Sequence, residues 1–329
     1  MKFPLSRSAA LPIVLLLLLM CLPQVAEVTE NGYLVSLCSR FLIYALAAVS
    51  LDLILGYGGM VSLGHALYVG VGAYVVGILA MHGQEGTVFM EWPLQVVGTD
   101  SALITIPAAV VISSVVACIF GALSLRTRGM HFIMITLAFA QMGYYFFISL
   151  EGYGGDDGLS LWARNTLPGI DLADDTSFYY LCLVALALFL FLSYKLVHSR
   201  FGRVIRGCKE NELRMEVLGF ATYRYKLVCF TIAGGGAGLA GALLANQSEF
   251  VSPGLLQWTH SGELLVMVIL GGVGSLLGPV LGAITLLSLE EILSAYTEHW
   301  MVFLGPVLVI VILFAKRGLY GLLTGRDHG

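Results

Sequence analysis

Long apolar runs separated by short polar segments dominate the chain. The hydrophobic positions fall in runs of roughly 20 residues, the length a helix needs to cross the hydrocarbon core of a bilayer. Within such a run every backbone polar group can find its partner inside the segment, as it must where no water is present. The pattern therefore predicts an all-α integral membrane protein with about ten transmembrane helices. Their expected limits are 9–26, 33–55, 65–82, 101–125, 130–150, 177–197, 225–246, 261–274, 276–293 and 301–315.

The composition agrees with a lipid environment. Of the 329 residues, 58% are apolar and only 12% are charged, whereas a soluble domain has roughly 25% charged residues. That excludes a soluble enzyme, because a water-soluble fold of this size needs a charged shell. Glycine contributes 39 residues, which favours close helix packing in a bilayer. The formal net charge of −4 suggests no nucleic-acid partner.

The positions of lysine and arginine set the orientation, since short cytoplasmic loops retain them. With ten spans and the N-terminus inside, all of the 17 Lys and Arg residues except Arg40 and Arg164 fall on the cytoplasmic side. We therefore expect both termini to be cytoplasmic. No loop is long enough to fold alone, so residues 1–329 form a single polytopic transmembrane domain.

The first segment, residues 1–28, allows two interpretations. Lys2 and Arg7 precede an apolar run, which also describes a secretory signal peptide. Met20 and Gln24 are poor residues for the corresponding cleavage sites. We expect the segment to be retained as a first span or N-terminal anchor.

Motifs of the common membrane enzymes and motors are missing from the sequence. None of the five lysines follows a glycine, so the chain lacks the phosphate-binding Gly-Lys-Ser/Thr turn. It also lacks H-E-x-x-H and G-x-S-x-G, which gives no catalytic or metal-binding candidates. Few ionisable residues lie deep in the spans, unlike in a typical proton-driven carrier. Of these, Asp52 and Glu263 are candidates for structural ion pairs.

Two glycine-broken stretches, 55–65 and 270–279, lie one in each half of the chain. Several glycines between apolar runs are typical of discontinuous helices that line a transport pathway. The alternative is tight helix crossing, for which the small residues at spacing four within 234–245 are a better example. The pathway candidates are Gly56, Gly58, Gly59, Ser62, Gly64, His65, Gly271, Gly272, Gly274 and Ser275.

The longest internal loop, 198–224, mixes charged and apolar positions. Arg203, Arg206, Lys209 and Glu210 would share one broad helical face, with a helix expected over 203–216. Such a segment fits either anionic lipid headgroups or a cytoplasmic protein partner. The mixed charge signs from Glu210 onward favour a protein groove.

Several motifs, in order, resemble the LivM-type permeases of branched-chain amino acid ABC importers. The resemblance runs from about residue 35 to 320. It is carried by Gly56–Tyr74, Leu125–Met130, Thr136–Ala140, Gly154–Leu159, Phe201–Arg203, Glu210–Glu212, Leu218–Gly219 and Leu270–Pro279.

The resemblance implies a permease subunit that works with other chains. Its expected partners are a LivH-type permease paralogue, two cytoplasmic ABC ATPases of the LivG and LivF type that bind ATP and magnesium, and a periplasmic substrate-binding protein in the bacterial inner membrane system. The loop at 198–224 then becomes the ATPase-coupling loop. Its candidate residues are Arg200, Phe201, Gly202, Arg203, Arg206, Glu210, Asn211 and Gly219.

The substrate and the class have alternatives. Permeases of urea and short-amide importers share most of these motifs, so branched-chain or other apolar amino acids are the first expectation and not the only one. A stand-alone secondary carrier or channel is a different class, and the shortage of buried ionisable groups weighs against it. A membrane enzyme or scaffold is disfavoured by the missing nucleophile and metal signatures.

Overall fold

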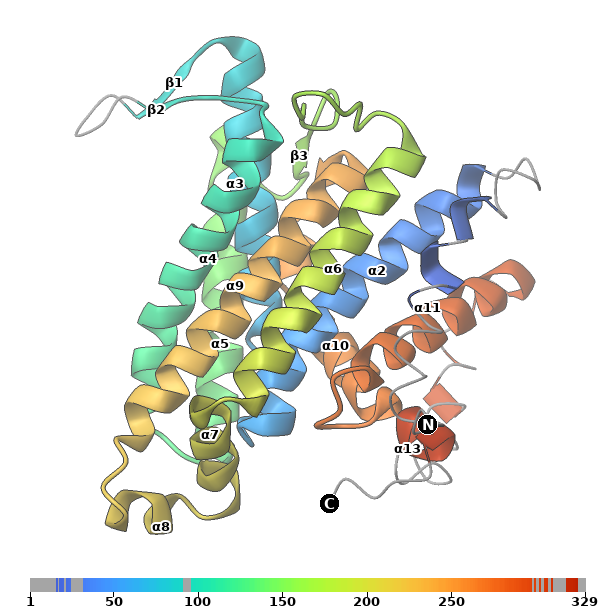
Figure 1. Cartoon of the computed structure of the whole chain (residues 1–329). Helices are drawn as coiled ribbons and strands as arrows, with labels where there is room; N and C mark the ends of the chain where they lie inside the picture. Colours follow the sequence, from blue (N-terminus) through green and yellow to red (C-terminus); the bar gives the residue numbers. More distant parts are fainter. Residues whose placement is uncertain are drawn as a thin grey trace.

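The computed structural model shows a helical bundle in which most helices run between the same two ends (Figure 1). It describes residues 16, 18–20, 22–24, 32–90, 96–297, 299, 302, 305–306, 309 and 318–324. The long helices of this part are α2 (Gly32–Asp52), α3 (His65–Glu85), α4 (Ala102–Ser124), α5 (Met130–Ile148), α6 (Asp175–His198), α9 (Thr222–Ser248) and α11 (Gly278–Tyr296). Shorter helices are α7 (Arg200–Glu210), α8 (Glu212–Val217), α10 (Trp258–Gly271) and α13 (Gly318–Thr324).

Seven helices in the described part are long and apolar enough to cross a membrane. They correspond to seven of the ten predicted spans, and the first of them extends through a π-helical turn to Tyr57. The eighth prediction, 261–274, has the right length but begins three residues too late, because the helix runs over 258–271. Its place is taken by α10, whose 14 residues span about 21 Å, less than the roughly 30 Å hydrocarbon core. The predicted spans 9–26 and 301–315 lie mostly outside the described residues.

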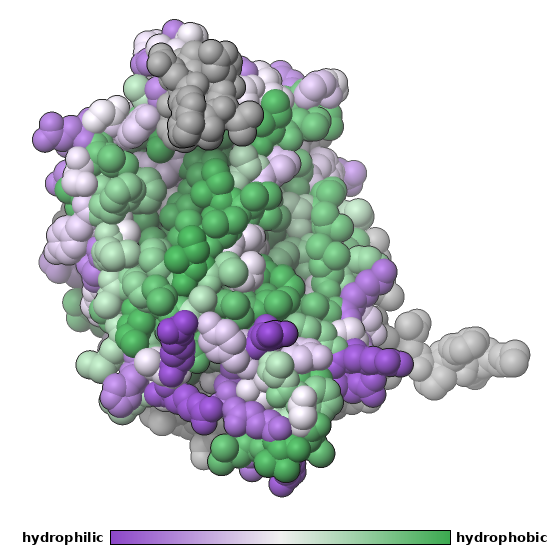
Figure 2. Space-filling model, turned by 90° about the vertical axis from the view of Figure 1, so that its left-hand side faces the viewer, coloured by the Kyte–Doolittle hydropathy of each residue, from purple (hydrophilic) through white to green (hydrophobic). Residues whose placement is uncertain are grey.

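Burial divides the spans into central and peripheral helices. About two thirds or more of α2, α3 and α9 is buried, whereas only about a fifth to a third of α4, α5 and α6 is buried. The exposed side chains of α4 include Val111, Val115 and Ile119, which recur at a spacing of four residues and form one apolar face. Figure 2 shows a largely hydrophobic surface on the side of the molecule that faces left in Figure 1. This surface suits acyl chains or another apolar membrane subunit.

Small residues of α9 bring the central helices close together. A Cβ atom on Gly72 of α3 would lie 2.7 Å from the Gly238 Cα, and one on Gly241 would lie 2.7 Å from the Val69 carbonyl carbon. Backbones at this distance leave no space for a side chain, which is how small residues stabilise helix contacts in a membrane. The stretch 234–245 is therefore a packing surface in the structure.

The two ends of the bundle differ in structure. One end carries α7 and α8, and we call it the α7–α8 end. The other carries two small antiparallel sheets: β1 (Val88–Met90) with β2 (Val96–Val97), and β3 (Leu159–Ser160) with β4 (Phe250–Val251). We call this the β3–β4 end. Its short helical turns are η2 (Glu151–Tyr153) and η3 (Pro253–Leu256).

Candidate translocation and coupling site

The first glycine-broken stretch interrupts the path between α2 and α3. After Asp52 the helix widens into a π-helical turn over Leu53–Tyr57, and residues 58–64 are not helical. Gly59 has a φ of 67°, a conformation that glycine adopts without steric cost. The predicted break is therefore present, and it lies at the α7–α8 end.

The second stretch separates α10 from α11. Helix α10 ends at Gly271, residues 272–277 form an irregular loop, and α11 begins at Gly278 with Pro279 in its first turn. Gly274 has a φ of 78°, and Ser275 Oγ donates to the Gly272 carbonyl at 2.6 Å. Helix α10 therefore stops before it could cross the membrane, and the loop 272–277 follows in its place.

The two stretches meet at Gly56 and Gly274. A Cβ atom on Gly56 would lie 2.5 Å from the Gly274 nitrogen and would also collide with the Asp52 carboxylate. The Gly274 N–H donates to Asp52 Oδ1 at 2.8 Å, and Asp52 is only 1% exposed. A buried carboxylate thus holds the loop 272–277 against the end of α2. We call this contact of Asp52, Gly56 and Gly274 the glycine junction.

Helix α7 reaches the glycine junction through Lys209. Its ammonium group donates to the Gly56 carbonyl at 2.9 Å. Carbonyls in the last turn of a helix lack intrahelical partners, and a cation there is favourable toward the helix dipole. The stem of Lys209 also packs on Gly59, where a Cβ atom would lie 2.9 Å from Lys209 Cγ. The sequence placed Lys209 on the polar face of a docking helix and did not predict this contact.

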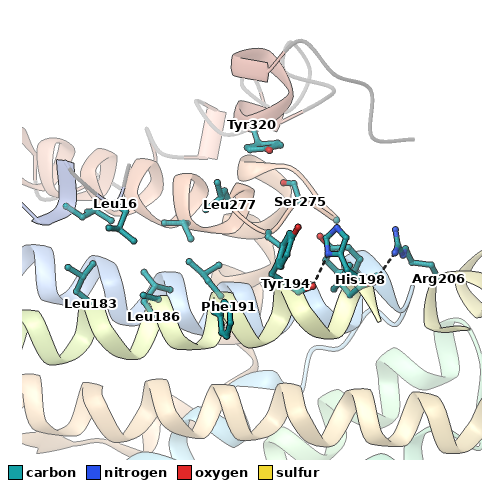
Figure 3. A pocket seen from close by; sticks show the side chains of 18 residues that line it. Leu16, Leu183, Leu186, Phe191, Tyr194, His198, Arg206, Ser275, Leu277 and Tyr320 are labelled. Atoms are coloured by element: carbon teal, nitrogen blue, oxygen red, sulfur yellow. Dashed lines mark hydrogen bonds between the residues drawn. The ribbon is translucent and has the colours of Figure 1, made fainter. Parts of the chain in front are cut away.

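A cavity of about 660 Å³ lies beside the glycine junction, between α6 and the loop 272–277. Leu183 and Leu186 of α6 line its apolar end, and Tyr194, His198 and Arg206 line the end nearest α7 (Figure 3). The complete lining is Leu16, Leu19, Tyr57, Leu183, Leu186, Ala187, Leu190, Phe191, Tyr194, Val197, His198, Arg206, Gly274, Ser275, Leu276, Leu277, Val280 and Tyr320. Of the ten pathway candidates, Gly274 and Ser275 are the two that line this cavity.

Most of the remaining pathway candidates are buried, whereas Gly59 is exposed beside Lys209. Gly64 lies against the Thr136 carbonyl of α5, at 2.6 Å from where its Cβ would be. His65 is fully buried, with Nε2 at 2.8 Å from Ser50 Oγ, and Ser62 Oγ accepts from the Gly64 N–H at 3.2 Å. Buried packing positions are also occupied by Gly58, Gly271 and Gly272. The glycine junction thus involves only part of each predicted stretch.

The predicted coupling helix 203–216 is two helices in the structure. Ser199 caps α7 by accepting from the Gly202 N–H. Gly202 lies where the chain turns from α6 into α7, and a Cβ atom at this position would be 2.5 Å from the Leu196 carbonyl oxygen. Asn211 then leaves the helical conformation, with a φ of −157°. Its side chain accepts from the Arg214 N–H at 2.9 Å and caps α8. An Asn cap of this kind starts a new helix, which explains the division.

Other coupling candidates lie at the surface or at the turns. Arg200, Arg203 and Glu210 are exposed, while the Phe201 ring packs in a tilted arrangement against Tyr225 with ring centroids 5.4 Å apart. Gly219 follows α8 with a φ of 86°. Arg206 is exposed as a residue, yet it donates to the Val197 carbonyl at 2.8 Å.

Helix α8 is tied to the bundle on one side and exposes apolar side chains. Glu212 forms ion pairs with Lys226 at 2.7 Å and with Arg128 at 3.5 Å, and Arg128 also pairs with Glu216 at 3.3 Å. Leu213, Val217 and Leu218 are 65%, 87% and 64% exposed. Figure 2 shows a hydrophilic belt near this end with a hydrophobic surface beyond it. Exposed apolar groups bordered by charges are typical of a protein interaction site.

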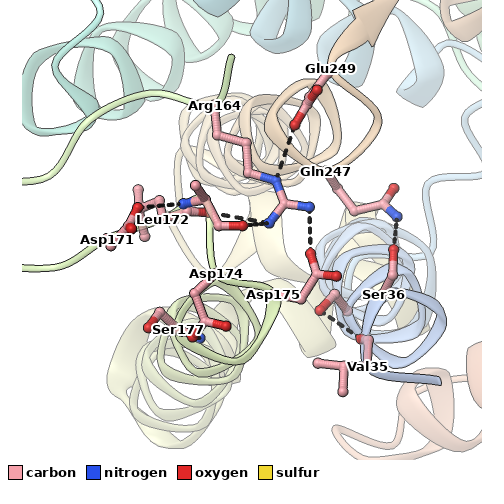
Figure 4. A network of polar contacts seen from close by, with 12 residues as sticks. Val35, Ser36, Arg164, Asp171, Leu172, Asp174, Asp175, Ser177, Gln247 and Glu249 are labelled. Carbon is pink, nitrogen blue, oxygen red and sulfur yellow. Dashed lines mark hydrogen bonds and ion pairs between the residues drawn. The ribbon is translucent and has the colours of Figure 1, made fainter. Parts of the chain in front are cut away.

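At the β3–β4 end, Arg164 binds three segments together (Figure 4). Its guanidinium contacts Asp175 at 2.6 Å and Glu249 at 3.6 Å, donates to the Leu172 carbonyl at 3.1 Å, and lies 4.9 Å from the centre of the Phe178 ring. We call this set of contacts the Arg164 clamp. Arg164 is one of the two basic residues that the sequence did not assign to the cytoplasmic side, and its charge is balanced here by Asp175 and Glu249.

The two ion-pair candidates have different partners. Asp52 accepts from the backbone of Gly274, and no ion pair within 4 Å is formed by Asp52 in the part of the chain described. Glu263 lies 2.8 Å from His260 Nδ1, a pair that is ionic only when the imidazole is protonated. Arg40 pairs with Glu290 at 3.7 Å, which accounts for the second arginine outside the charge asymmetry.

The seven spans of the described part are those of a multi-pass membrane protein. Residues 33–312 match the family described as branched-chain amino acid transport system, permease component. The match covers most of the chain, and the protein belongs to this family.

The chain is similar to several permease proteins that are named for branched-chain amino acid transport. The chain is 26% identical over 309 residues to the high-affinity branched-chain amino acid transport system permease protein LivM of Salmonella typhimurium, covering 87% of this chain and 69% of that protein. LivM of Escherichia coli is 27% identical with the same coverage. LivH of Escherichia coli is 25% identical over 296 residues, covering 84% of this chain and 91% of LivH. No solved structure matches the chain.

Proposed function

We propose that this chain is a transmembrane permease subunit of a binding-protein-dependent ABC importer in the bacterial inner membrane. Family membership makes it an importer permease, and its relatives are named for branched-chain amino acid transport. We extend that substrate class, branched-chain or other apolar amino acids, to this chain. The complete protein would cross the membrane about ten times with both termini in the cytoplasm.

The assembly would contain a second permease and two ATPases that bind ATP and magnesium. A second permease is supported by the similarity of this chain to both LivM and LivH proteins, which points to related paired subunits. This chain would itself bind no nucleotide, because none of its lysines stands in a phosphate-binding turn. A soluble binding protein would deliver substrate at the β3–β4 end.

The exposed apolar surface of α8 is the observation that carries the proposal. Leu213, Val217 and Leu218 project at the end of the molecule where arginines and lysines gather. An apolar centre with a charged border fits a groove in a soluble partner better than it fits anionic lipid. Substrate would pass beside the cavity next to the glycine junction, in a pathway completed by the second permease.

The test is recovery of an ATPase with the tagged chain from its native membrane. A Val217→Asp variant puts a charge at the centre of the α8 surface, so we expect at least about a tenfold loss of recovered ATPase, as for an interface hot spot. Ile170→Asp is the matched control, because Ile170 is 51% exposed at the opposite end. Equal recovery of ATPase with both variants would refute docking at α8.

Substrate class is tested on the binding protein recovered with the complex. We expect calorimetric binding of leucine and not of urea or acetamide. Binding of urea or acetamide alone would assign the short-amide alternative. Uphill uptake driven by an ion gradient in vesicles that hold only this chain would instead establish a secondary carrier.

A further inference from the structure

Lys209 joins two parts of the molecule that are far apart in sequence. It lies on α7, next to the proposed ATPase-docking helix α8, and its ammonium group binds the Gly56 carbonyl at 2.9 Å, 153 residues away. The same residue packs along Gly59. One flexible side chain therefore spans the gap between the cytoplasmic helices and the glycine junction.

The glycine junction is rigid enough to pass a displacement onward. Gly56 contacts Gly274 backbone to backbone, because neither residue has a side chain to act as a soft spacer. Asp52, one turn before Gly56, fixes the Gly274 N–H at 2.8 Å. A shift of the Gly56 carbonyl must therefore move the loop 272–277 or break the Asp52 hydrogen bond.

The junction also holds a polar atom without a partner. Asp52 Oδ2 is buried and, within the described residues, accepts no hydrogen bond. A buried oxygen of this kind is costly to leave without a partner, so the junction is held by fewer hydrogen bonds than its polar atoms could form.

We propose that Lys209 is a positioning residue that transmits movement of α7 to the loop 272–277, through its bond to Gly56 and the contact of Gly56 with Gly274. This inference rests on the proposed function, which supplies the ATPase that moves α7 and α8. When α7 shifts, the Lys209 ammonium pulls on the Gly56 carbonyl. That movement displaces the loop that forms one wall of the cavity beside α6.

The first test compares variants of Lys209 in the complete importer, purified through a tag on this chain and placed in vesicles. Lys209→Met keeps the length of the stem and removes the charge. We expect unchanged recovery of ATPase and unchanged basal ATP hydrolysis. Transport per ATP hydrolysed should fall by about tenfold or more, the factor that corresponds to losing one hydrogen bond to a charged group. Lys209→Arg should restore part of the transport.

Lys195→Met is the matched control. Lys195 also lies at the α7–α8 end, where its ammonium stands 4.6 Å from the centre of the Phe191 ring without reaching the junction. It should transport as the unmodified protein does. Equal transport per ATP in Lys209→Met and Lys195→Met would overturn the inference. Failure to recover any ATPase with the unmodified chain would instead refute the proposed function.

A second measurement follows the loop directly. Val273 is 41% exposed on the loop 272–277, so a Val273→Cys variant can be labelled with a maleimide that does not cross the membrane. We expect ATP to change the labelling rate when Lys209 is present and to leave it unchanged in Lys209→Met. The chain without Val273→Cys corrects for its native cysteines. The same ATP-dependent change in both backgrounds would show that the signal does not pass through Lys209.

Discussion

The Arg164 clamp and the glycine junction both connect distant segments, yet they do so by opposite means. At the clamp, a single guanidinium makes redundant contacts with two carboxylates, backbone carbonyls and an aromatic ring. At the junction, single hydrogen bonds from Lys209 and Gly274 hold three backbones together around one half-satisfied carboxylate. Loss of one of its contacts should leave the Arg164 clamp intact, whereas loss of one of its hydrogen bonds should open the glycine junction.

This difference assigns a static and a movable end to the molecule. Redundant contacts keep the outer segments of α6 and α9 in one arrangement, which suits a surface that a soluble protein must recognise repeatedly. Contacts that depend on single bonds can exchange between two arrangements at low cost. The predictions below are therefore designed to separate loss of stability from loss of coupling.

The largest effect on stability is expected from Arg164→Met. The Arg164 side chain is only 11% exposed, so its removal leaves carboxylates and carbonyls at the β3–β4 end without their common donor. We expect a loss of about 3 kcal/mol, near the lower limit for breaking a buried ion pair because the carboxylates are partly exposed. Unfolding by dodecyl sulfate in mixed micelles measures it, with exposed Arg224→Met as control. Transport per ATP in the folded fraction should remain unchanged, and a fall there would erase the contrast with the junction.

A smaller loss of stability with a larger loss of coupling is expected from Gly56→Ala. The new methyl group would collide with Gly274 and with Asp52. Overpacking of this kind costs about 2 kcal/mol, but it also separates the two backbones that pass movement onward. Gly262→Ala is the control, because that Cβ would meet nothing within 4 Å. Normal transport per ATP in Gly56→Ala would mean that close backbone contact is dispensable.

The smallest effect is expected from Asp174→Ala, which removes the N-cap of α6. The Asp174 carboxylate accepts from the Ser177 N–H at 3.0 Å, and this backbone hydrogen bond lowers the pKa of the carboxyl below its ordinary value. Loss of the cap should cost about 1 kcal/mol at neutral pH.

The pH dependence of that loss follows from the direction of the pKa shift. A lowered pKa in the folded state stabilises the protein above the pKa of the unfolded chain, and this contribution is lost as the pH falls through the folded value. The difference in unfolding free energy between Asp174 and Asp174→Ala proteins should therefore shrink below a pH of about 4. A difference independent of pH would mean that the carboxylate is not the capping group.

The sequence predicted those features that depend on residues close together in the chain. Seven spans follow from apolar runs, and the non-helical residues near Gly58 and Gly274 follow from glycine clusters. The short length of the eighth segment was visible in the sequence, but its end was placed three residues too late because the apolar run continues past Gly271 into the loop. The break at Asn211 had a visible signal, since Asn is a favoured N-cap residue, but the charged residues on both sides fitted one helix equally well.

The junction itself was beyond such patterns. Asp52 and Gly274 are 222 residues apart, and Lys209 is 153 residues from Gly56. Nothing in the immediate neighbourhood of Lys209 distinguishes a lysine that points to a carbonyl in the bundle from one that points to solvent. Only the packing of α7 on the end of α2 makes that choice.

The helix break at Asn211 divides this segment into two arms that run in different directions (Figure 1). One arm, α8, exposes leucine and valine side chains, and the other, α7, holds the lysine that binds a carbonyl of the bundle. Under the proposed function, substitutions on α8 would alter the affinity for an ATPase and leave the contact of α7 with the bundle in place. Such a permease could adapt to a changed ATPase while its glycine junction stays the same.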